Sequence, residues 1–163
     1  MKKSQTHKLP IIGWREWVGL PDLNVSWIKT KVDTGARSCS LHASNIKEFT
    51  KDGIQFVEFR LHPHQRKPEL FVQTTAKVFD TRKVKSSSGE TTNRPVILTR
   101  ISLMGQIWAV ELTLANREGM GFRMLLGREA FRGKFIVDSD NSFYNGKPKK
   151  KQIKEMESES ESG

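Results

Sequence analysis

The chain has 163 residues, of which 36% are hydrophobic, 28% are charged and one is cysteine, and its formal net charge is +10. These values are typical of a single soluble domain, and they argue against an internal disulfide, a secretory signal and a membrane span, because no apolar run approaches the roughly 20 residues that a bilayer requires. We therefore expect a cytoplasmic protein whose basic surface is compatible with an acidic protein substrate, and no nucleic-acid binding, because the cations are scattered rather than arranged in a stripe.

Residues 1–9 are polar and are expected to form a flexible N-terminus. From residue 10 onward the dominant period is two, which is typical of β-strands. Met104-Gly105 marks a hairpin turn between two of these segments. Strands are expected over residues 26–32, 55–61, 70–79, 96–102, 106–114 and 135–137. So many short strands with turns between them predict an all-β barrel or sandwich.

Helical patterning is scarce. The best candidate is a turn or two over residues 128–132, and another turn is expected over residues 45–49. Residues 146–163 carry a lysine block followed by alternating glutamate and serine, with almost nothing to bury, which predicts a disordered tail. The folded body is therefore expected over residues 10–145.

The sharpest chemical signal is Asp33-Thr34-Gly35, which directly follows the strand over residues 26–32. Glycine at position 35 is expected to allow a tight turn that a side chain would prevent, so that the Asp33 carboxylate is held at the end of a rigid strand. The same tripeptide forms a plain turn in many proteins, so alone it does not identify a catalytic site.

A second signal lies 94 positions later (127 − 33), where an apolar run over residues 124–126 meets Gly127. A short helical pattern begins at Arg128. The plain interpretation is a strand that ends at a glycine turn. The order of the two signals along the chain is more informative than either one.

The pair resembles the retroviral-type aspartic proteases, the retropepsins, in which an apolar strand enters Asp-Thr-Gly-Ala and a later apolar-apolar-Gly-Arg segment passes beside the catalytic loop. The resemblance implies a closed retropepsin-like β barrel with one short helix after Gly127, whose backbone would pass too close to its neighbour for a side chain. It also implies that Asp33 is catalytic, in a loop supported by Thr34, Gly35, Ala36, Gly127 and Arg128.

The match narrows to small bacterial retropepsin-like proteins that are labelled ATP-dependent zinc proteases. Some of them accompany an ATP-grasp ligase that adds glutamates to the C-terminus of a ribosomal protein. The resemblance covers about residues 11–145 and is carried by residues 11–18, 31–37, 84–89, 93–96 and 122–129. It implies an acidic or glutamylated protein or peptide substrate, such as a ribosomal protein, and an ATP-grasp ligase as a partner.

A single Asp-Thr-Gly motif implies two chains. Aspartic peptidases need two carboxyl groups about 3 Å apart that share one proton, and Asp80 and Asp138 are not followed by a glycine turn. A homodimer supplies the second Asp33 across a two-fold axis. The hydroxyl of Thr34 would then contact the loop of the opposite chain.

The residue after the motif bears on the working pH. Ala36 has no hydroxyl to donate to the carboxylate, so we expect a working pH nearer neutral than that of acid proteases.

Residues 84–96 form a polar, glycine-containing segment between strands. In a retropepsin such a hairpin is a flap that closes over the substrate, although a solvated hairpin end explains the pattern equally well. Its tip would carry Ser86, Ser87, Ser88 and Gly89. The cations that could face an acidic substrate are Arg37, Lys85, Arg94 and Arg128.

Metal and nucleotide sites receive little support from the sequence. Cys39, His42, His62 and His64 could in principle form a zinc site, but neither His-Glu-x-x-His nor Cys-x-x-Cys occurs. Residues 127–134 differ from a phosphate loop in their spacing, and Phe135 stands where Ser or Thr should bind magnesium. We therefore expect neither zinc nor ATP as a cofactor.

Two alternatives to an aspartic endopeptidase stay open. One is a catalytically silent retropepsin-like binding module that regulates the ligase or the ribosome. The other is a zinc peptidase or a peptidyl-transferring enzyme on the same fold. Trp14, Trp17 and Trp27 are expected in the core or on the dimer face.

Overall fold

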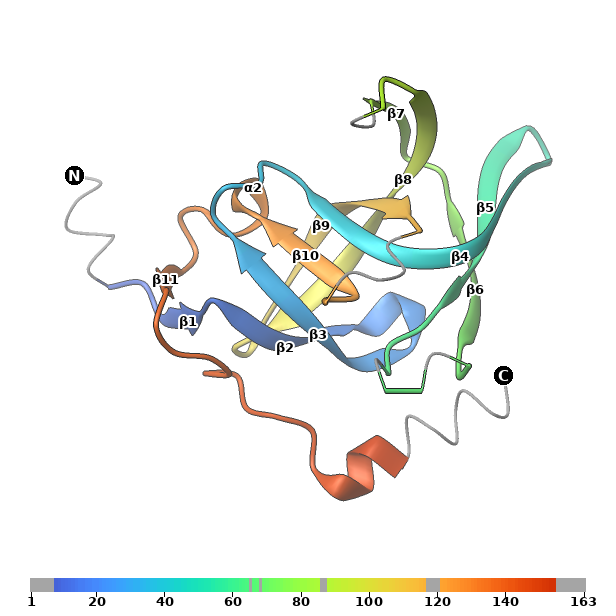
Figure 1. The fold of residues 1–163 in the computed structure, drawn as a ribbon. Helices are drawn as coiled ribbons and strands as arrows, with labels where there is room; N and C mark the ends of the chain where they lie inside the picture. The colour runs from blue at the N-terminus through green and yellow to red at the C-terminus, as the bar shows by residue number, and fades with distance from the viewer. Residues whose placement is uncertain (1–7, 65, 68, 86–87, 117–120, 155–163) are drawn as a thin grey trace.

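The computed structural model describes residues 8–64, 66–67, 69–85, 88–116 and 121–154, and most of its regular structure is β-strand (Figure 1). The elements are β1 (Ile11–Gly13), β2 (Arg15–Leu20), η1 (Pro21–Leu23), β3 (Val25–Asp33), β4 (Cys39–Lys51), β5 (Ile54–Leu61), β6 (Val72–Lys77), β7 (Asp80–Lys85), β8 (Thr91–Leu103), β9 (Gln106–Ala115), β10 (Met124–Gly127), α2 (Arg128–Phe131) and β11 (Ile136–Asp138). The all-β class predicted from the sequence is confirmed. None of the helices in the described ranges is long and apolar enough to cross a membrane.

The six expected strands correspond to β3, β5, β6, β8, β9 and β11, with somewhat different ends. The helix predicted after Gly127 is α2, a single turn. Of the expected flexible N-terminus, residues 1–7 lie outside the described residues.

The helical turn expected over residues 45–49 is wrong, because these residues belong to β4. The first residues of β4 pair with β9 and β10, whereas β4 pairs with β5 from Ala43 onward. Near this change of partner Asn45 has a φ of 50°, and the register with β5 shifts between Ser44 and Lys47. Such a bulge interrupts the period of two, so the sequence pattern did not indicate a strand here.

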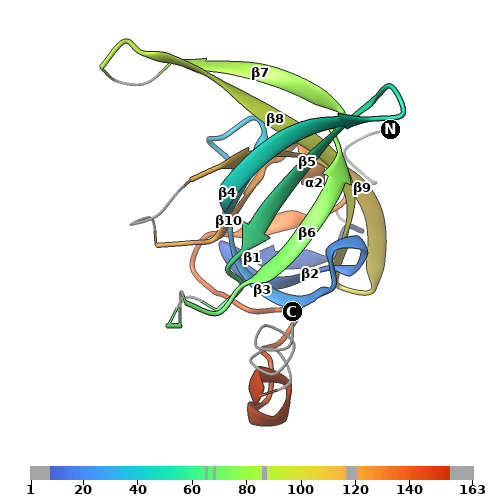
Figure 2. The same cartoon turned by 90° about the vertical axis from the view of Figure 1, so that its right-hand side faces the viewer.

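The strands form one large sheet and one small sheet. In the large sheet the order is β10-β3-β2-β8-β9-β4-β5-β6, with β7 paired to β8. Because β10 also pairs with β4, the strand pairing can be followed through β10, β3, β2, β8, β9 and β4 and back to β10. β1 and β11 form the small sheet as a parallel pair. The β7–β8 hairpin extends away from the remaining strands (Figure 2).

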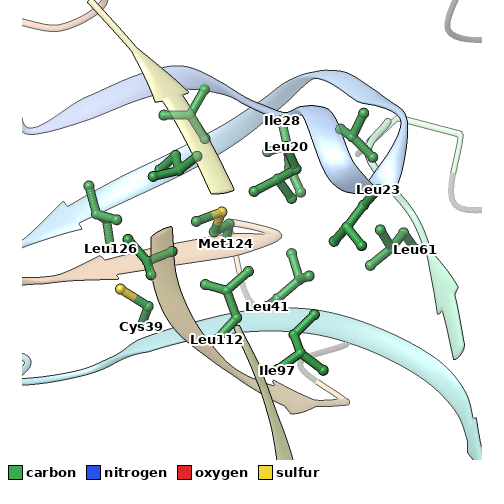
Figure 3. Close-up of a cluster of buried hydrophobic side chains, with 14 of the residues drawn as sticks. Leu20, Leu23, Ile28, Cys39, Leu41, Leu61, Ile97, Leu112, Met124 and Leu126 are labelled. Atoms are coloured by element: carbon green, nitrogen blue, oxygen red, sulfur yellow. The ribbon is translucent and has the colours of Figure 1, made fainter. Parts of the chain in front are cut away.

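The core lies between these strands, and side chains from β2, β3, β4, β8, β9 and β10 meet there (Figure 3). On β3 the alternate residues Ile28, Thr30 and Val32 are buried. The residues between them therefore face outward, which places Asp33 on the outer face of the strand. Trp14, Trp17 and Trp27 are half-buried and lie outside this core cluster; their expected place on a dimer face stays a prediction.

The segment after β11 is tied to β2 through the buried side chain of Glu16. Its carboxylate accepts hydrogen bonds from the backbone N–H groups of Gly13 (2.6 Å), Tyr144 (2.9 Å) and Asn145 (2.9 Å). The Asn145 side chain in turn donates to the Trp17 carbonyl at 2.8 Å.

The region expected to be a disordered tail, residues 146–163, is described as far as residue 154. Residues 150–154 are helical, and the N–H of Ile153 donates to the Lys149 carbonyl at 3.0 Å. The rest of the expected tail lies outside the described residues.

Candidate active site

Asp33 is the last residue of β3, and the chain turns immediately after it. Its Oδ1 accepts hydrogen bonds from the backbone N–H groups of Gly35 (2.9 Å) and Ala36 (3.2 Å). The Ala36 N–H also lies 3.3 Å from the Asp33 carbonyl oxygen. The half-buried carboxylate is therefore held by its own turn at the edge of the sheet.

Gly35 lies close to the Asp33 carboxylate, which differs from the role expected of it. Its φ is not in the left-handed region, so the backbone conformation itself does not require glycine. A Cβ at this position would lie 3.3 Å from Asp33 Oδ1. A side chain would therefore crowd the carboxylate rather than prevent the turn.

Gly127 lies where β10 runs beside the end of β3. The two strands are parallel, and Gly127 is in register with Asp33. A Cβ on Gly127 would come within 2.4 to 2.7 Å of the Ser38 backbone. The Gly127 N–H donates to the sulfur of Cys39 at 3.4 Å. The approach is so close that only glycine fits at this position.

The start of α2 hydrogen bonds to the chain that follows Asp33. The Arg128 N–H donates to the Ala36 carbonyl at 2.8 Å, and the N–H of Glu129 donates to the Arg37 carbonyl at 3.2 Å. The Arg128 guanidinium, through Nη1, reaches the carbonyls of Thr34 (3.5 Å) and Gly35 (3.4 Å). Four successive carbonyls are thus satisfied by α2, which fixes the loop from outside.

The structure therefore brings together the residues expected to form and support the catalytic loop. The flap candidates lie elsewhere, on the β7–β8 hairpin. Lys85 pairs with Thr91 next to the tip, and Arg94 pairs with Arg82 farther along. Ser88 and Gly89 are exposed at the tip, and Gly89 has a φ of +88°. The two remaining candidates, Ser86 and Ser87, lie outside the described residues.

Arg37 lines a cavity of about 690 Å³ between β9 and α2, which does not include Asp33. Its carboxylates are paired: Glu111 with Arg82 at 3.3 Å and Glu129 with Arg132 at 3.2 Å. This cavity is thus separate from the carboxylate that the sequence singled out.

The four residues considered for zinc are not grouped as the ligands of one metal ion. Burial raises the pKa of the Cys39 thiol to about 11, so the sulfur stays protonated at neutral pH. His62 Nε2 is 2.6 Å from the Ser44 hydroxyl, and the His42 and His62 ring centres are 5.3 Å apart. Across the described ranges, no three His, Cys, Asp or Glu side chains are grouped so that they could hold a metal ion. The expectation that no cofactor binds stays a prediction.

Sequence reasoning missed the cations that share the outer face of β3 with Asp33. Lys29 and Lys31 precede Asp33 at intervals of two, so their side chains lie on the same side of the strand. Arg15 on β2 stands directly opposite Lys31. The period of two indicates Lys29 and Lys31 from sequence alone, whereas the position of Arg15 depends on the register between two strands.

Comparison with known proteins bears on this arrangement. The family model described as RimB-like, retropepsin-like aspartic endopeptidase RimB, matches residues 11–148. A Shewanella halifaxensis protein named probable alpha-L-glutamate ligase is 46% identical over 146 residues, which are 90% of this chain and 32% of the relative. A Shewanella pealeana protein of the same name is 49% identical over 136 residues, 83% of this chain and 30% of the relative. The chain spans about a third of the length of these curated relatives.

A solved structure from Legionella pneumophila, described as a protein with unknown function (DUF785), has the same fold. It superposes with a TM-score of 0.66 at 32% sequence identity. The match covers 83% of this chain and 98% of that chain, so the shared fold accounts for nearly the whole of the Legionella protein.

Proposed function

The chain belongs to the RimB-like family of retropepsin-like aspartic endopeptidases, and on that premise we propose that it is an aspartic endopeptidase with Asp33 as its catalytic residue. The observation that carries the proposal is the fixed carboxylate at the end of β3. Oδ1 is held by two backbone N–H groups, whereas Oδ2 has no hydrogen-bond partner within the described part of the chain. That oxygen is thereby left for a water molecule or a second carboxyl group.

The second carboxyl group comes from a homodimer, in which two Asp33 loops meet across a two-fold axis. Exposure of Thr34 in the single chain supports this arrangement, since its side chain is then accessible to the partner loop. The closed barrel is supported by the pairings that return from β4 to β10. The projecting β7–β8 hairpin is suited to act as the flap.

In the dimer the two Asp33 carboxyl groups share one proton. The ionised carboxylate removes a proton from water, and the water oxygen bonds to the carbonyl carbon of the scissile peptide. The protonated carboxyl donates its proton to the carbonyl oxygen. The tetrahedral intermediate then breaks its C–N bond: the protonated carboxyl gives its proton to the amine nitrogen, and the ionised carboxylate takes a proton from one hydroxyl of the intermediate. This restores the dyad with one shared proton. Gly127 and Arg128 act as positioning residues, since they contact the loop rather than the reacting atoms.

The proposed substrate is an acidic or glutamylated protein or peptide, such as a ribosomal protein, and the proposed setting is the cytoplasm. The net charge of +10 favours such a substrate by long-range attraction. The name of the relatives, probable alpha-L-glutamate ligase, supports an association with a ligase that makes glutamate chains.

One observation favours a second candidate, a binding or regulatory module without catalysis. In the curated relatives, the region similar to this chain is only about a third of a longer protein that is named a ligase. A segment within a ligase can serve to hold or regulate rather than to cleave. The fixed geometry of the Asp33 loop is required by the first candidate and not by this one.

The two candidates are separated by incubating the purified protein with glutamylated and plain tail peptides and following the products by mass spectrometry. An aspartic peptidase cleaves with the unmodified chain, loses cleavage in Asp33→Asn and is unaffected by a chelator. Cleavage that a chelator abolishes identifies a zinc peptidase. Tight binding with no cleavage by either protein identifies the module.

A further inference from the structure

A group of four cations surrounds three aromatic rings on the outer face that carries Asp33. We name it the basic–aromatic strip, and it consists of Arg15, Lys29, Lys31 and Lys147 with Trp14, Phe122 and Phe143. Arg15 and Lys31 are directly opposite each other in the antiparallel β2–β3 pair. Like charges at such positions destabilise a sheet.

Phe143 lies at the centre of the strip. Its ring centre is 4.8 Å from Lys147 Nζ, 4.9 Å from Arg15 Cζ and 5.8 Å from Lys29 Nζ. Phe143 also has a φ of 63°, which is unusual for a bulky side chain. Its N–H donates to the Arg15 carbonyl at 3.0 Å, which anchors this conformation against β2.

The other two rings extend the same arrangement. Arg15 Cζ is 4.7 Å from the Trp14 ring centre, and Lys29 Nζ is 5.9 Å from that of Phe122. The rings of Trp14 and Phe122 meet edge to face, with their centres 6.1 Å apart. Cations therefore already cover the rings, which makes the rings poor platforms for stacking nucleic-acid bases and leaves the charges as the recognition groups.

The cations of the strip repel one another. Partial burial, followed by repulsion from Arg15, Arg66 and Lys147, holds the pKa of Lys29 below its usual range. Among the ion pairs between described residues, none involves a cation of the strip. The fold thus keeps like charges close to one another, and a bound anion would reduce this repulsion.

We propose that the basic–aromatic strip binds the carboxylate side chains of an extended acidic peptide that lies along β3 and ends its path at Asp33. Residues two apart on a strand are separated by about 7 Å, and alternate side chains of an extended peptide have the same spacing. Lys31 and Lys29 therefore match every second glutamate of such a peptide. The inference rests on the proposed function, because Asp33 is taken as the site of cleavage.

Binding is tested separately from cleavage with the full chain carrying Asp33→Asn. Fluorescence anisotropy is measured with labelled hexaglutamate, hexaglutamine and a single-stranded hexanucleotide. Adding Lys29→Gln and Lys31→Gln together is expected to weaken hexaglutamate binding roughly three- to tenfold and to leave hexaglutamine unchanged. The matched control is Lys47→Gln with Lys51→Gln, which removes the same charge from exposed positions of β4. This pair is expected to change binding by less than about twofold.

Equal losses in the two double variants would overturn the proposal, because general charge rather than the strip would then attract the peptide. Tighter binding of the hexanucleotide that depends on Lys29 and Lys31 would also overturn it. Circular dichroism and thermal unfolding establish that each variant is folded. Because the Lys29 and Lys31 variant loses like charges from the strip, its melting temperature is expected to be unchanged or higher than that of the parent.

Cleavage by the unmodified chain distinguishes failure of this inference from failure of the proposed function. If the strip is a specificity site, the Lys29 and Lys31 variants lose their preference for acidic over neutral peptides, mainly through a raised KM. If Asp33→Asn cleaves as the parent does, the proposed function fails, while the anisotropy result still decides the inference. If cleavage needs Asp33 but the preference for acidic peptides survives in the variants, only the inference fails.

Discussion

At the scale of single residues, the site depends on two glycines that act in different ways. A Cβ on Gly35 would approach a side-chain atom, Asp33 Oδ1, whereas a Cβ on Gly127 would meet the Ser38 backbone. A side-chain atom can shift to admit a Cβ, whereas the Ser38 backbone, next to β10 and β4, can shift only at a larger cost in energy. Gly127 is therefore the less replaceable of the two.

We expect Gly127→Ala to destabilise the fold by about 1 to 3 kcal/mol, the usual cost of inserting a carbon into a packed region. The free energy of unfolding is measured by urea titration. Gly121→Ala is the control, because a Cβ there meets nothing within 4 Å and its φ is not left-handed. Equal stability of the two variants would show that β10 does not pass as close to Ser38 as described.

Cys39 provides a second test at this scale. With a pKa of about 11, its thiol should react with iodoacetamide at pH 8 roughly a hundredfold more slowly than an ordinary cysteine. Labelling is followed by mass spectrometry in buffer and in denaturant. Rapid modification in buffer, at the rate seen after unfolding, would contradict the buried position behind Gly127.

At the scale of elements, the C-terminal segment depends on Glu16. We expect Glu16→Gln to lower the free energy of unfolding by about 1 to 3 kcal/mol, because the amide NH₂ would face backbone N–H groups and leave buried donors unsatisfied. Chemical denaturation measures the change. Glu90→Gln, at an exposed position, is the matched control and should have almost no effect. No difference between the two would argue against the contact with residues 144 and 145.

The same segment carries a pH-dependent contact at Asp138. Hydrogen bonds from the Tyr144 hydroxyl (2.5 Å) and the Asn141 amide (2.9 Å) lower its pKa from 3.8 to about 2. A carboxyl with a lowered folded-state pKa stabilises the fold above its unfolded pKa and loses that effect as the pH falls through its folded value.

We therefore expect Tyr144→Phe to be less stable than the parent at pH 5, with a difference that shrinks as the pH falls from about 4 to about 2. Thermal unfolding across this range measures the difference. A difference that stays constant with pH would mean that the hydroxyl does not act through the Asp138 carboxylate.

The sequence predicted regular strands better than irregular ones. β3, β5 and β9 follow the period of two, and their positions were correct. β4 changes partner at a bulge around Asn45, and this depends on strands distant in the sequence. Likewise the Asp33 loop was visible as a motif, whereas the basic–aromatic strip needs the β2–β3 register and the return of Phe143 from the C-terminal segment.

At the scale of the whole molecule, the proposed catalytic centre requires two chains. The single chain presents one fixed carboxylate with one oxygen engaged, next to a row of cations on β3. A partner related by a two-fold axis would supply the second carboxyl group and a second strip. An acidic peptide could then be held on both sides of the bond that is cut.

The most direct test is to mix the unmodified chain with an equal amount of Asp33→Asn, allow the subunits to exchange, and measure the rate of cleavage of an acidic peptide. If each centre needs both carboxyl groups, mixed dimers are inactive and the rate falls to roughly a quarter of that of the undiluted parent at the same total concentration. A rate of roughly one half would mean that each chain works with its own Asp33 alone, and it would contradict the shared centre.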